Sequence, residues 1–236
     1  MLNNIRIVLV ETAHPGNIGS VARAMKTMGL KHLYLVRPNL FPSQTADALA
    51  SSAKDVLDNA VVVDALDDAI ADCHVVMGTS TRSRTIPWPL LSPRELAEKA
   101  RDEFNHTQVA ILFGREQSGL TNEELHRCHF HVQIPANPEY SSLNIAAAVQ
   151  VIAYELYFAS LTESQPGSWD YPLATAKELE GFYTHLETVL INMDFLNPKA
   201  PRQLMTRLRR LFGRAQMDVM EVNILRGILA AVNNKL

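Results

Sequence analysis

The stretch IPANPEYSSLNIAAAVQVIAYE, residues 134–155, joins two segments of opposite character. Its second half, from Ile145 to Tyr154, is almost wholly apolar, which predicts a buried helix. The loop before it carries two prolines, two serines and two asparagines, together with Glu139 and Tyr140. A connection between a strand and a helix needs only about 2–6 residues. The polar groups of this loop therefore exceed what a simple connection requires.

Outward from this stretch, short apolar runs alternate with helical patterns over residues 1–161. The predicted strands cover residues 5–10, 32–36, 60–63, 74–78, 109–113 and 129–134, and the predicted helices cover 18–28, 46–57, 66–72, 93–103, 121–127 and the residues after 143. This alternation predicts the α/β class, with a mostly parallel sheet covered on both faces. In such sheets, ligands bind beyond the carboxyl ends of the strands.

The end of the chain has a different pattern. Residues 162–174, TESQPGSWDYPLA, predict a linker, and three helical patterns follow it over 175–236. Residues 1–174 carry 13 Lys and Arg against 19 Asp and Glu, whereas residues 175–236 carry 9 against 6. A small basic helical domain on an acidic body indicates a polyanionic partner.

Composition excludes several classes of protein. The two cysteines, Cys73 and Cys128, predict no disulfide framework and favour a reducing compartment. The run Cys128-His129-Phe130-His131 makes an incomplete metal site, so we expect no metal. The first residues lack the pattern of a signal peptide, and no apolar stretch reaches the length of a membrane span. A cytoplasmic protein without membrane contact is expected.

The loop after the first strand, ETAHPGNIGSVARAMK, is the first candidate site. Gly16 and Gly19 flank Asn17 where a helix begins, and Arg23 lies about one turn inside it. Free backbone N–H groups at a helix N-terminus favour an anion. The spacing matches no nucleotide-phosphate motif, and a turn followed by a solvated arginine is the alternative.

Two further loops follow predicted strands. GTSTRSRTIPW, residues 78–88, offers polar atoms and two arginines without a nearby acid, which favours either phosphate contact or an exposed polar loop. LFGREQSGLTNEEL, residues 112–125, contains a capping box from Thr121 to Glu124. That box leaves Gly114, Glu116 and Gly119 unexplained, although Glu116 could simply pair with its neighbour Arg115.

In the loop quoted first, Ser141 or Ser142 is expected to cap the helix. A cap explains one serine and leaves Tyr140 and Asn144 without a role. Because this loop and the two at 78–88 and 113–120 all follow strands, we expect them to converge on one crevice.

The segment RQLMTRLRRLFGR, residues 202–214, holds five arginines and no acidic residue. Its apolar residues lie at helical spacing, and Arg207, Arg210 and Arg214 lie on another face. Contact with a nucleic-acid backbone is favoured over a solvated face.

The segments NIGSVAR, LFGREQSGLTNEEL and 134–155 resemble the three motifs of the SPOUT (SpoU–TrmD) RNA methyltransferases. Together with TSTRSRTIPWP and the arginine-rich tail, they are similar to bacterial members that methylate the ribose 2′-hydroxyl of cytidine or uridine at position 32 of the tRNA anticodon loop. The resemblance implies S-adenosylmethionine as cofactor, tRNA as substrate, a homodimer, and a deep trefoil knot at the carboxyl end of the α/β domain.

The resemblance also implies roles for individual residues. Arg23 and Ser142 would act at the reacting ribose, with Arg23 presented across the dimer interface. Cofactor binding is expected of Thr79, Ser80, Thr81, Gly114, Ile134, Ser141, Ser142 and Leu143. Substrate binding is expected of Asn17, Arg82, Arg84, Glu116, Tyr140 and Asn144, and in the tail of Arg207, Arg209, Arg210 and Arg214.

Three other functions compete with this one. A nucleotide-binding dehydrogenase lacks support, because no glycine fingerprint is present. An RNA-binding module without activity explains the arginines but leaves Ser142, Asn144 and the glycine-bearing loops unexplained. The nearest alternative is a SPOUT methyltransferase acting on ribosomal RNA or on another tRNA position.

Overall fold

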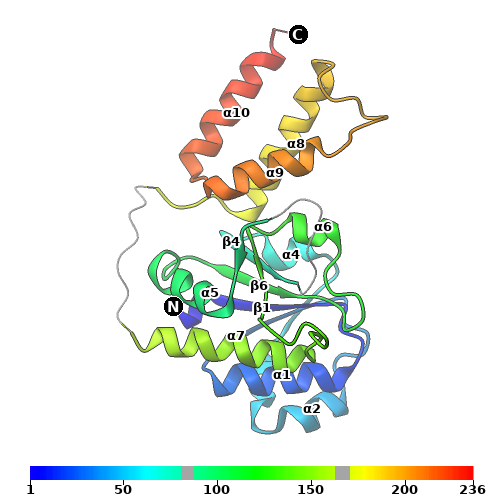
Figure 1. The fold of residues 1–236 in the computed structure, drawn as a ribbon, viewed down its shortest axis with the longest axis vertical. Coiled ribbons are helices and arrows are strands. Elements are labelled where there is room, and N and C mark those ends of the chain that lie inside the picture. The colour runs from blue at the N-terminus through cyan, green and yellow to red at the C-terminus, as the bar shows by residue number, and fades with distance from the viewer. Residues whose placement is uncertain (81–87, 163–170, 236) are drawn as a thin grey trace.

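A seven-stranded parallel sheet forms the centre of the larger part of the molecule (Figure 1). The computed structural model describes residues 1–80, 88–162 and 171–235. The strands are β1 (Ile5–Val10), β2 (His32–Val36), β3 (Val61–Val63), β4 (Val75–Thr79), β5 (Leu90–Leu91), β6 (Val109–Phe113) and β7 (Phe130–Val132). They lie in the order β3-β2-β1-β6-β4-β7-β5, and all paired neighbours are parallel.

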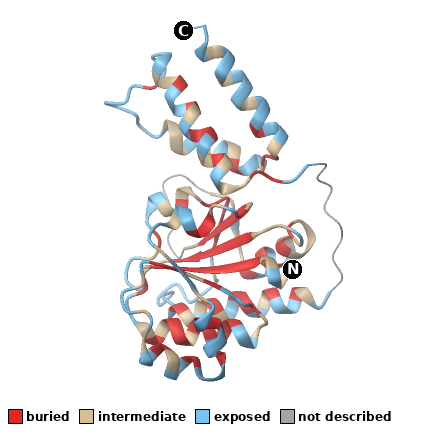
Figure 2. Ribbon diagram, turned by 180° about the vertical axis from the view of Figure 1, so that it is seen from behind, coloured by how far each residue is buried: buried red, intermediate tan, exposed pale blue. Residues whose placement is uncertain are grey.

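Helices cover both faces of this sheet. One face packs on α1 (Pro15–Thr27), α2 (Gln44–Ala50), α3 (Lys54–Asp58), α5 (Pro93–Asp102) and α7 (Ile145–Ser160), with short 3-10 turns at Leu2–Asn4 and Ser51–Ala53. The other face packs on α4 (Leu66–Ile70) and α6 (Asn122–His126). Figure 2 shows the central strands almost wholly buried between these layers, as expected for a parallel sheet. Strands β1–β7 with helices α1–α7 are called the sheet domain below.

The remaining helices form a separate small core. They are α8 (Ala176–Asn192), α9 (Leu204–Ala215) and α10 (Val219–Asn233), called the helical tail below. Phe182, Leu186 and Met217 are among the buried residues of its core. The tail packs on the α4 and α6 side of the sheet, opposite α1 and α7 (Figure 1). Backbone hydrogen bonds from Ala176 to the Cys73 carbonyl and from Lys177 to the Ala71 carbonyl join the two parts.

The predicted α/β pattern is confirmed, with local differences. Strand β5 was not predicted, because two residues are too few for a periodic signal. The predicted helix over 46–57 is interrupted, and Ser51 has a positive φ of 52° there. Helix α1 begins at Pro15 rather than at residue 18, because the His14 side chain accepts a hydrogen bond from the Gly16 amide and proline suits the first turn.

The strand order decides where the candidate loops meet. Strand β4 lies between β6 and β7, so the carboxyl ends of these three strands are adjacent. The residues that follow them at 79–80, 114–120 and 133–144 therefore lie at one edge of the sheet. The expected convergence of the loops is confirmed for their described residues. Within the described part of the chain, no helix is both long and apolar enough to cross a bilayer.

Candidate active site

A cleft of about 420 Å³ opens at the edge of the sheet where these loops meet. Strand β4 contributes Thr79 and Ser80, and the segment after β6 contributes residues 113–120. Residues Val132, Ile134, Tyr140 and 142–145 follow from β7, and Ala148 of α7 completes the wall. A volume of this size is typical of sites for small organic ligands, which occupy roughly 300–1,000 Å³.

The lining of the cleft combines apolar and polar residues. Ile134, Leu143 and Ala148 supply apolar surface, and Ser142 and Asn144 supply exposed polar groups. The hydroxyl of Thr79 is not free, since it donates to the Leu112 carbonyl at 2.9 Å. This mixture suits a ligand with a flat apolar part and several polar groups.

The loop after β6 is held closed by its own glycines. A Cβ on Gly114 would lie 2.1 Å from the carbonyl carbon of Gly119, so only glycine lets the two sides of this loop approach so closely. Gly119 has a φ of +70°, a conformation that favours glycine. The Arg115 and Gly119 backbones exchange hydrogen bonds at 3.3 and 2.8 Å.

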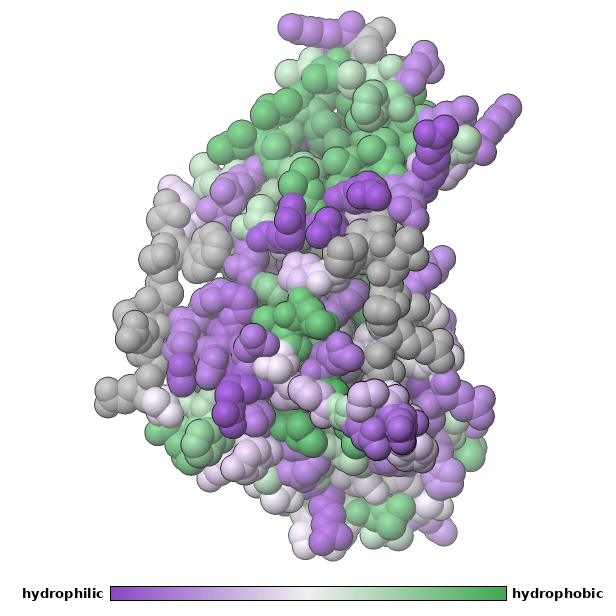
Figure 3. Space-filling view, viewed as in Figure 1, coloured by the Kyte–Doolittle hydropathy of each residue, from purple (hydrophilic) through white to green (hydrophobic). Residues whose placement is uncertain are grey.

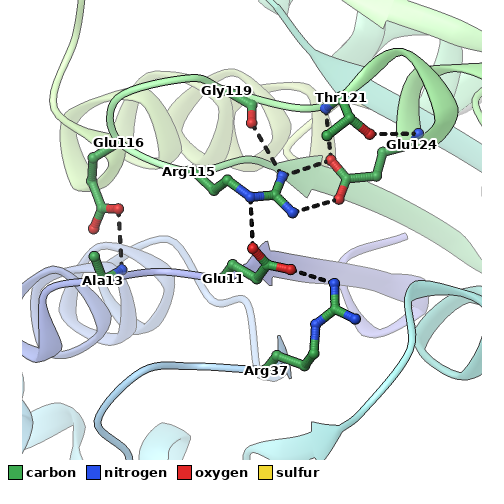
Figure 4. Close-up of polar contacts among 8 residues, drawn as sticks. All are labelled: Glu11, Ala13, Arg37, Arg115, Glu116, Gly119, Thr121 and Glu124. Atoms are coloured by element: carbon green, nitrogen blue, oxygen red, sulfur yellow. Dashed lines mark hydrogen bonds and ion pairs between the residues drawn. The ribbon is translucent and has the colours of Figure 1, made fainter.

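Arg115 anchors this loop to the sheet domain (Figure 4). Its guanidinium donates twice to Glu124, at 3.0 Å each, and once to Glu11 at 2.7 Å. Glu11 also pairs with Arg37. A pair between Arg115 and its sequence neighbour Glu116 was one expectation, and it is wrong, because distant carboxylates take the guanidinium. The capping box of Thr121 and Glu124 is confirmed.

Glu116 is engaged with the start of α1. Its carboxylate accepts from the amides of Ala13 (3.1 Å) and His14 (3.3 Å) and from the Asn17 side chain (2.9 Å). Burial by itself raises the pKa of Glu116, but these hydrogen bonds outweigh burial and lower the pKa. The carboxylate also complements the positive end of the helix dipole. Glu116 therefore joins the first glycine-bearing loop to the second.

Asn144 caps α7, and the serine cap expected from the sequence is wrong. The Asn144 side-chain oxygen accepts from the Ala146 amide at 2.9 Å, and its amide donates to the Asn17 oxygen at 3.0 Å. An asparagine directly before the helix reaches the free N–H groups better than a serine two or three residues upstream. This frees Ser142 to face the cleft, whereas Ser141 is exposed outside its lining.

The other expected site residues lie apart from the cleft or outside the described structure. Arg23 is exposed on α1 and does not line the cleft of its own chain. Thr81, Arg82 and Arg84 lie outside the described residues. Gln117 and Ser118 line the cleft and were not predicted, although their place between two loop glycines was a usable signal.

The arginines of α9 divide into two groups. Arg207 and Arg214 are exposed, and Arg210 is partly buried. Arg209 is held inside the molecule by two hydrogen bonds to Glu180, both 2.8 Å, and its guanidinium lies 4.3 Å from the Tyr183 ring centroid.

The described residues contain no cluster of three or more His, Cys, Asp and Glu side chains arranged to hold a metal ion. His129, directly before β7, is buried, and its Nδ1 accepts a hydrogen bond from the Val76 amide at 3.1 Å. Cys128 is buried as well, and burial raises the pKa of its thiol.

Comparisons with known proteins match both parts of the chain. Residues 4–154 match the SpoU rRNA Methylase family, and residues 177–236 match the C-terminal domain of tRNA methyltransferase TrmJ. The chain is 56% identical to the tRNA (cytidine/uridine-2′-O-)-methyltransferase TrmJ of Cronobacter sakazakii, over 99% of this chain and 98% of the relative. The corresponding protein of Pectobacterium atrosepticum is also 56% identical, over 98% of each.

Solved structures show the same likeness. The crystal structure of TrmJ from Z. mobilis ZM4 has a TM-score of 0.85 and 34% identity, and the match covers 97% of this chain and 98% of that one. A probable methylase family protein from Haemophilus influenzae Rd KW20 has a TM-score of 0.65 and 45% identity, covering 100% and 98%. The sequence match, the fold and the cleft agree, and the chain belongs to the SpoU methylase family of methyltransferases, together with the TrmJ proteins.

Proposed function

We propose that this protein transfers a methyl group from S-adenosylmethionine to the ribose 2′-hydroxyl of cytidine or uridine at position 32 of the tRNA anticodon loop. The observation that carries the proposal is the convergence of three loops, each following a strand, on one cleft whose polar wall includes Ser142 and Asn144. The names of the relatives supply the reaction and the tRNA substrate.

The cleft fits the cofactor in size and in chemistry. Ile134 and Leu143 can flank an adenine, and the backbone groups around Gly114 and Ile134 can take its polar edge. The hydroxyl of Ser142 and the exposed polar side chain of Asn144 suit the ribose and the amino-acid part of the cofactor. A SpoU methyltransferase from Streptomyces viridochromogenes, of the same fold, has been solved in complex with this cofactor. When bound, S-adenosylmethionine supplies an electrophilic methyl group.

The residues of this chain orient the ribose hydroxyl and lower its pKa. A ribose hydroxyl is a weak acid, so its oxygen must be placed in line with the methyl group. Positioning alone contributes about 7–11 kcal/mol in favourable cases. Ser142 orients the oxygen, and Arg23 binds the neighbouring phosphate and lowers the pKa of the hydroxyl. A guanidinium stays protonated, so Arg23 acts as a cation and not as the base.

A homodimer brings Arg23 to the cleft of the partner subunit. Support comes from α7, where Val151, Tyr154, Phe158 and Leu161 are exposed along one face, with Tyr154 and Phe158 stacked at 6.2 Å. An exposed apolar stripe of this kind marks a protein interface. Because α1 packs beside α7, the same interface includes the helix that carries Arg23. Phe158→Asp should yield monomers in sedimentation, and a stable dimer in that variant would contradict this interface.

The deep trefoil knot is part of the same proposal. Support comes from the sheet order, in which β4 separates β6 from β7, so that the chain returns to the same edge several times. The loops after β6 and β7 both line the cleft, where the cofactor is expected.

The helical tail supplies affinity for tRNA in this proposal. Arg207 and Arg214 are exposed cations on α9. A solved structure described as giving insights into the 2-OH methylation of C/U34 on tRNA has 28% identity and a TM-score of 0.53, and the match covers 66% of this chain but 96% of that one. That structure therefore corresponds to little more than the sheet domain, which supports a role for the tail in selecting a different position.

Mapping of the modified nucleotide tests the proposal. Purified protein, S-adenosylmethionine and unmodified tRNA transcripts should give ribose methylation at position 32, lost when that ribose is 2′-deoxy. Methylation at position 34, or of ribosomal RNA only, would favour the alternative SPOUT substrates. Absence of cofactor binding in calorimetry, with and without tRNA, would remove the enzymatic function.

A further inference from the structure

A chain of ion pairs runs from the sheet domain into the helical tail. Arg127, directly after α6, donates to Asp67 at 3.0 and 3.3 Å and to Glu180 of α8 at 2.8 Å. Glu180 in turn accepts both hydrogen bonds from Arg209 of α9. Glu180 is therefore the one described carboxylate that an arginine from the sheet domain and an arginine from the basic helix both bind.

These groups are ionised and partly shielded from water. The exposed fractions of the Glu180, Arg127 and Arg209 side chains are 32%, 30% and 16%, respectively. Burial by itself raises the pKa of Glu180, but the hydrogen bonds and charges of Arg209 and Arg127 outweigh burial and lower the pKa. Bidentate pairs of Arg127 with Asp67 and of Arg209 with Glu180 fix the orientation of the two side chains that meet in the single Arg127–Glu180 contact.

Apolar packing fills only part of the boundary between the two parts, where Leu173 and Ala176 pack against the cores of the sheet domain. A cavity of about 360 Å³ lies between them, lined on one side by Asp68 and His129 and on the other by Lys177 and Tyr183. In Figure 3, hydrophilic side chains lie between the hydrophobic face of the helical tail and the sheet domain. Beside this cavity, the ion pairs of Glu180 and the two backbone hydrogen bonds at the start of α8 are directional contacts that restrict the angle between the two parts.

On the sheet-domain side, the short helix α6 connects Arg127 to the loop that lines the cleft. Arg127 follows the single turn of α6, and α6 begins with the capping box of Thr121 and Glu124. Glu124 binds Arg115, which holds the loop at 114–120 that lines the cleft. Only a few residues therefore separate the cleft loop from the attachment of the tail.

We propose that Glu180 is a positioning residue, which fixes the angle between the basic helix α9 and the cleft so that tRNA bound by the tail presents its target ribose to the methyl donor. This inference rests on the proposed function. Glu180 does not contact substrate in it, and acts through Arg127 and Arg209. Misplacement of a reacting group by about 1 Å can cost about 100-fold in rate.

The inference predicts an unusual pair of effects for Glu180→Gln. The substitution removes a negative charge and releases two guanidinium groups toward the RNA, so tRNA should bind equally well or more tightly. The angle of the tail is lost at the same time, so methyl transfer at saturating tRNA should fall at least tenfold. A residue that merely contacted RNA, or merely stabilised the fold, would not combine slower transfer with undiminished affinity.

The matched control is Glu187→Gln. Glu187 is exposed two turns further along α8 and forms no ion pair with the described residues. The control removes the same charge from the same helix and should keep the rate of the unaltered protein. Single-turnover rates at saturating tRNA, tRNA affinity over a range of salt, and cofactor affinity are measured for both variants.

A second variant changes the sheet-domain partner of Glu180. Arg127→Gln leaves the pair of Glu180 with Arg209 inside the tail but cuts its link to the sheet domain. It should be as slow as Glu180→Gln, and the double variant should be no slower than either, because all three lose the same link. Faster hydrogen exchange at the Ala176 and Lys177 amides, without a change in the unfolding temperature of the sheet domain, should accompany the loss.

The outcomes separate this inference from the function on which it rests. A normal transfer rate in Glu180→Gln, or slower transfer explained wholly by weaker tRNA binding, would overturn the positioning role. Additive losses in the double variant would overturn it too. If the unaltered protein neither binds nor methylates tRNA, the proposed function fails instead.

Discussion

Asn144 donates a hydrogen bond from its side-chain amide to the side-chain oxygen of Asn17, across 3.0 Å and 127 positions of sequence. The side-chain amide of Asn17 in turn donates a hydrogen bond to the Glu116 carboxylate at 2.9 Å. The three residues come from the three loops that carry the family motifs. Their mutual contacts hold the start of α1, the loop after β6 and the start of α7 together at the cleft.

Asn17→Asp should break this arrangement. It replaces the donor to Glu116 by a carboxylate oxygen and places two negative charges in contact. Loss of a hydrogen bond to a charged group costs about 1.5–3 kcal/mol, and we expect a loss of this size in the free energy of unfolding. Cofactor affinity should fall about tenfold, since the cleft loops separate. Urea denaturation and calorimetric titration measure the two effects.

Asn223→Asp on α10 is the control, because Asn223 is exposed and far from the cleft. Adjacent carboxyl groups raise the pKa of one of them, so the deficit in cofactor affinity of Asn17→Asp should shrink at pH 5. A pH-independent deficit, or none, would show that the contact with Glu116 does not hold the loops.

Arg23→Ala should abolish methyl transfer while cofactor binding persists. The reason is that Arg23 is exposed on α1, outside the cleft of its own chain, and serves the acceptor ribose. Lys26→Ala, one turn further along α1, removes an exposed cation paired with Asp55 and should keep activity. Mixed dimers of Arg23→Ala with Ser142→Ala should recover part of the activity. Near-normal turnover of Arg23→Ala would refute the role.

His129 makes stability depend on pH. Burial lowers the pKa of His129 to about 4, whereas an unfolded histidine titrates near ~6.5. Between these values the unfolded chain binds the proton and the folded chain does not, so stability is present above pH ~6.5 and is lost as pH falls. Between pH 7 and pH 5, the free energy of unfolding should fall by about 2 kcal/mol more than it does in a variant that lacks this histidine.

His129→Gln keeps an acceptor for the Val76 amide and removes the titration, so its stability should change less over that range. His106→Gln, at an exposed position, should behave as the unaltered protein does. Denaturant midpoints of the three proteins at several pH values test whether His129 causes the pH dependence of stability. Equal slopes for all three proteins would mean that His129 is protonated in the folded state.

Arg207→Gln combined with Arg214→Gln should weaken tRNA binding and make it less dependent on salt. Each lost phosphate contact reduces the log–log salt slope by about 0.7–0.9. Cofactor affinity should be unchanged, because α9 lies away from the cleft. Lys235→Gln provides a control at the far end of the tail. An unaltered salt slope in the double variant would show that these arginines face solvent.

The sequence by itself determined the layers of this protein and most of its strands and helices, although not β5 or the break between α2 and α3. Buried parallel strands need continuous apolar runs, and runs such as those of β1 and β6 are visible without any structure. The capping box at Thr121 was equally local, since its donors and acceptors lie within four residues. Motif resemblance added the family, through segments such as the one that begins at Asn17 and the one that contains Ser142.

Tertiary structure alone decided the partners of the charged and amide side chains. Arg115 pairs with Glu11 and Glu124 and not with its neighbour Glu116. Asn144 caps α7, a role that the sequence predicted for a serine. Arg209 turned inward to Glu180, although the helical pattern of α9 gave no sign of it. Long polar side chains bind the best-placed opposite group within a few ångströms, and that group is fixed by how distant elements pack, which no local pattern records.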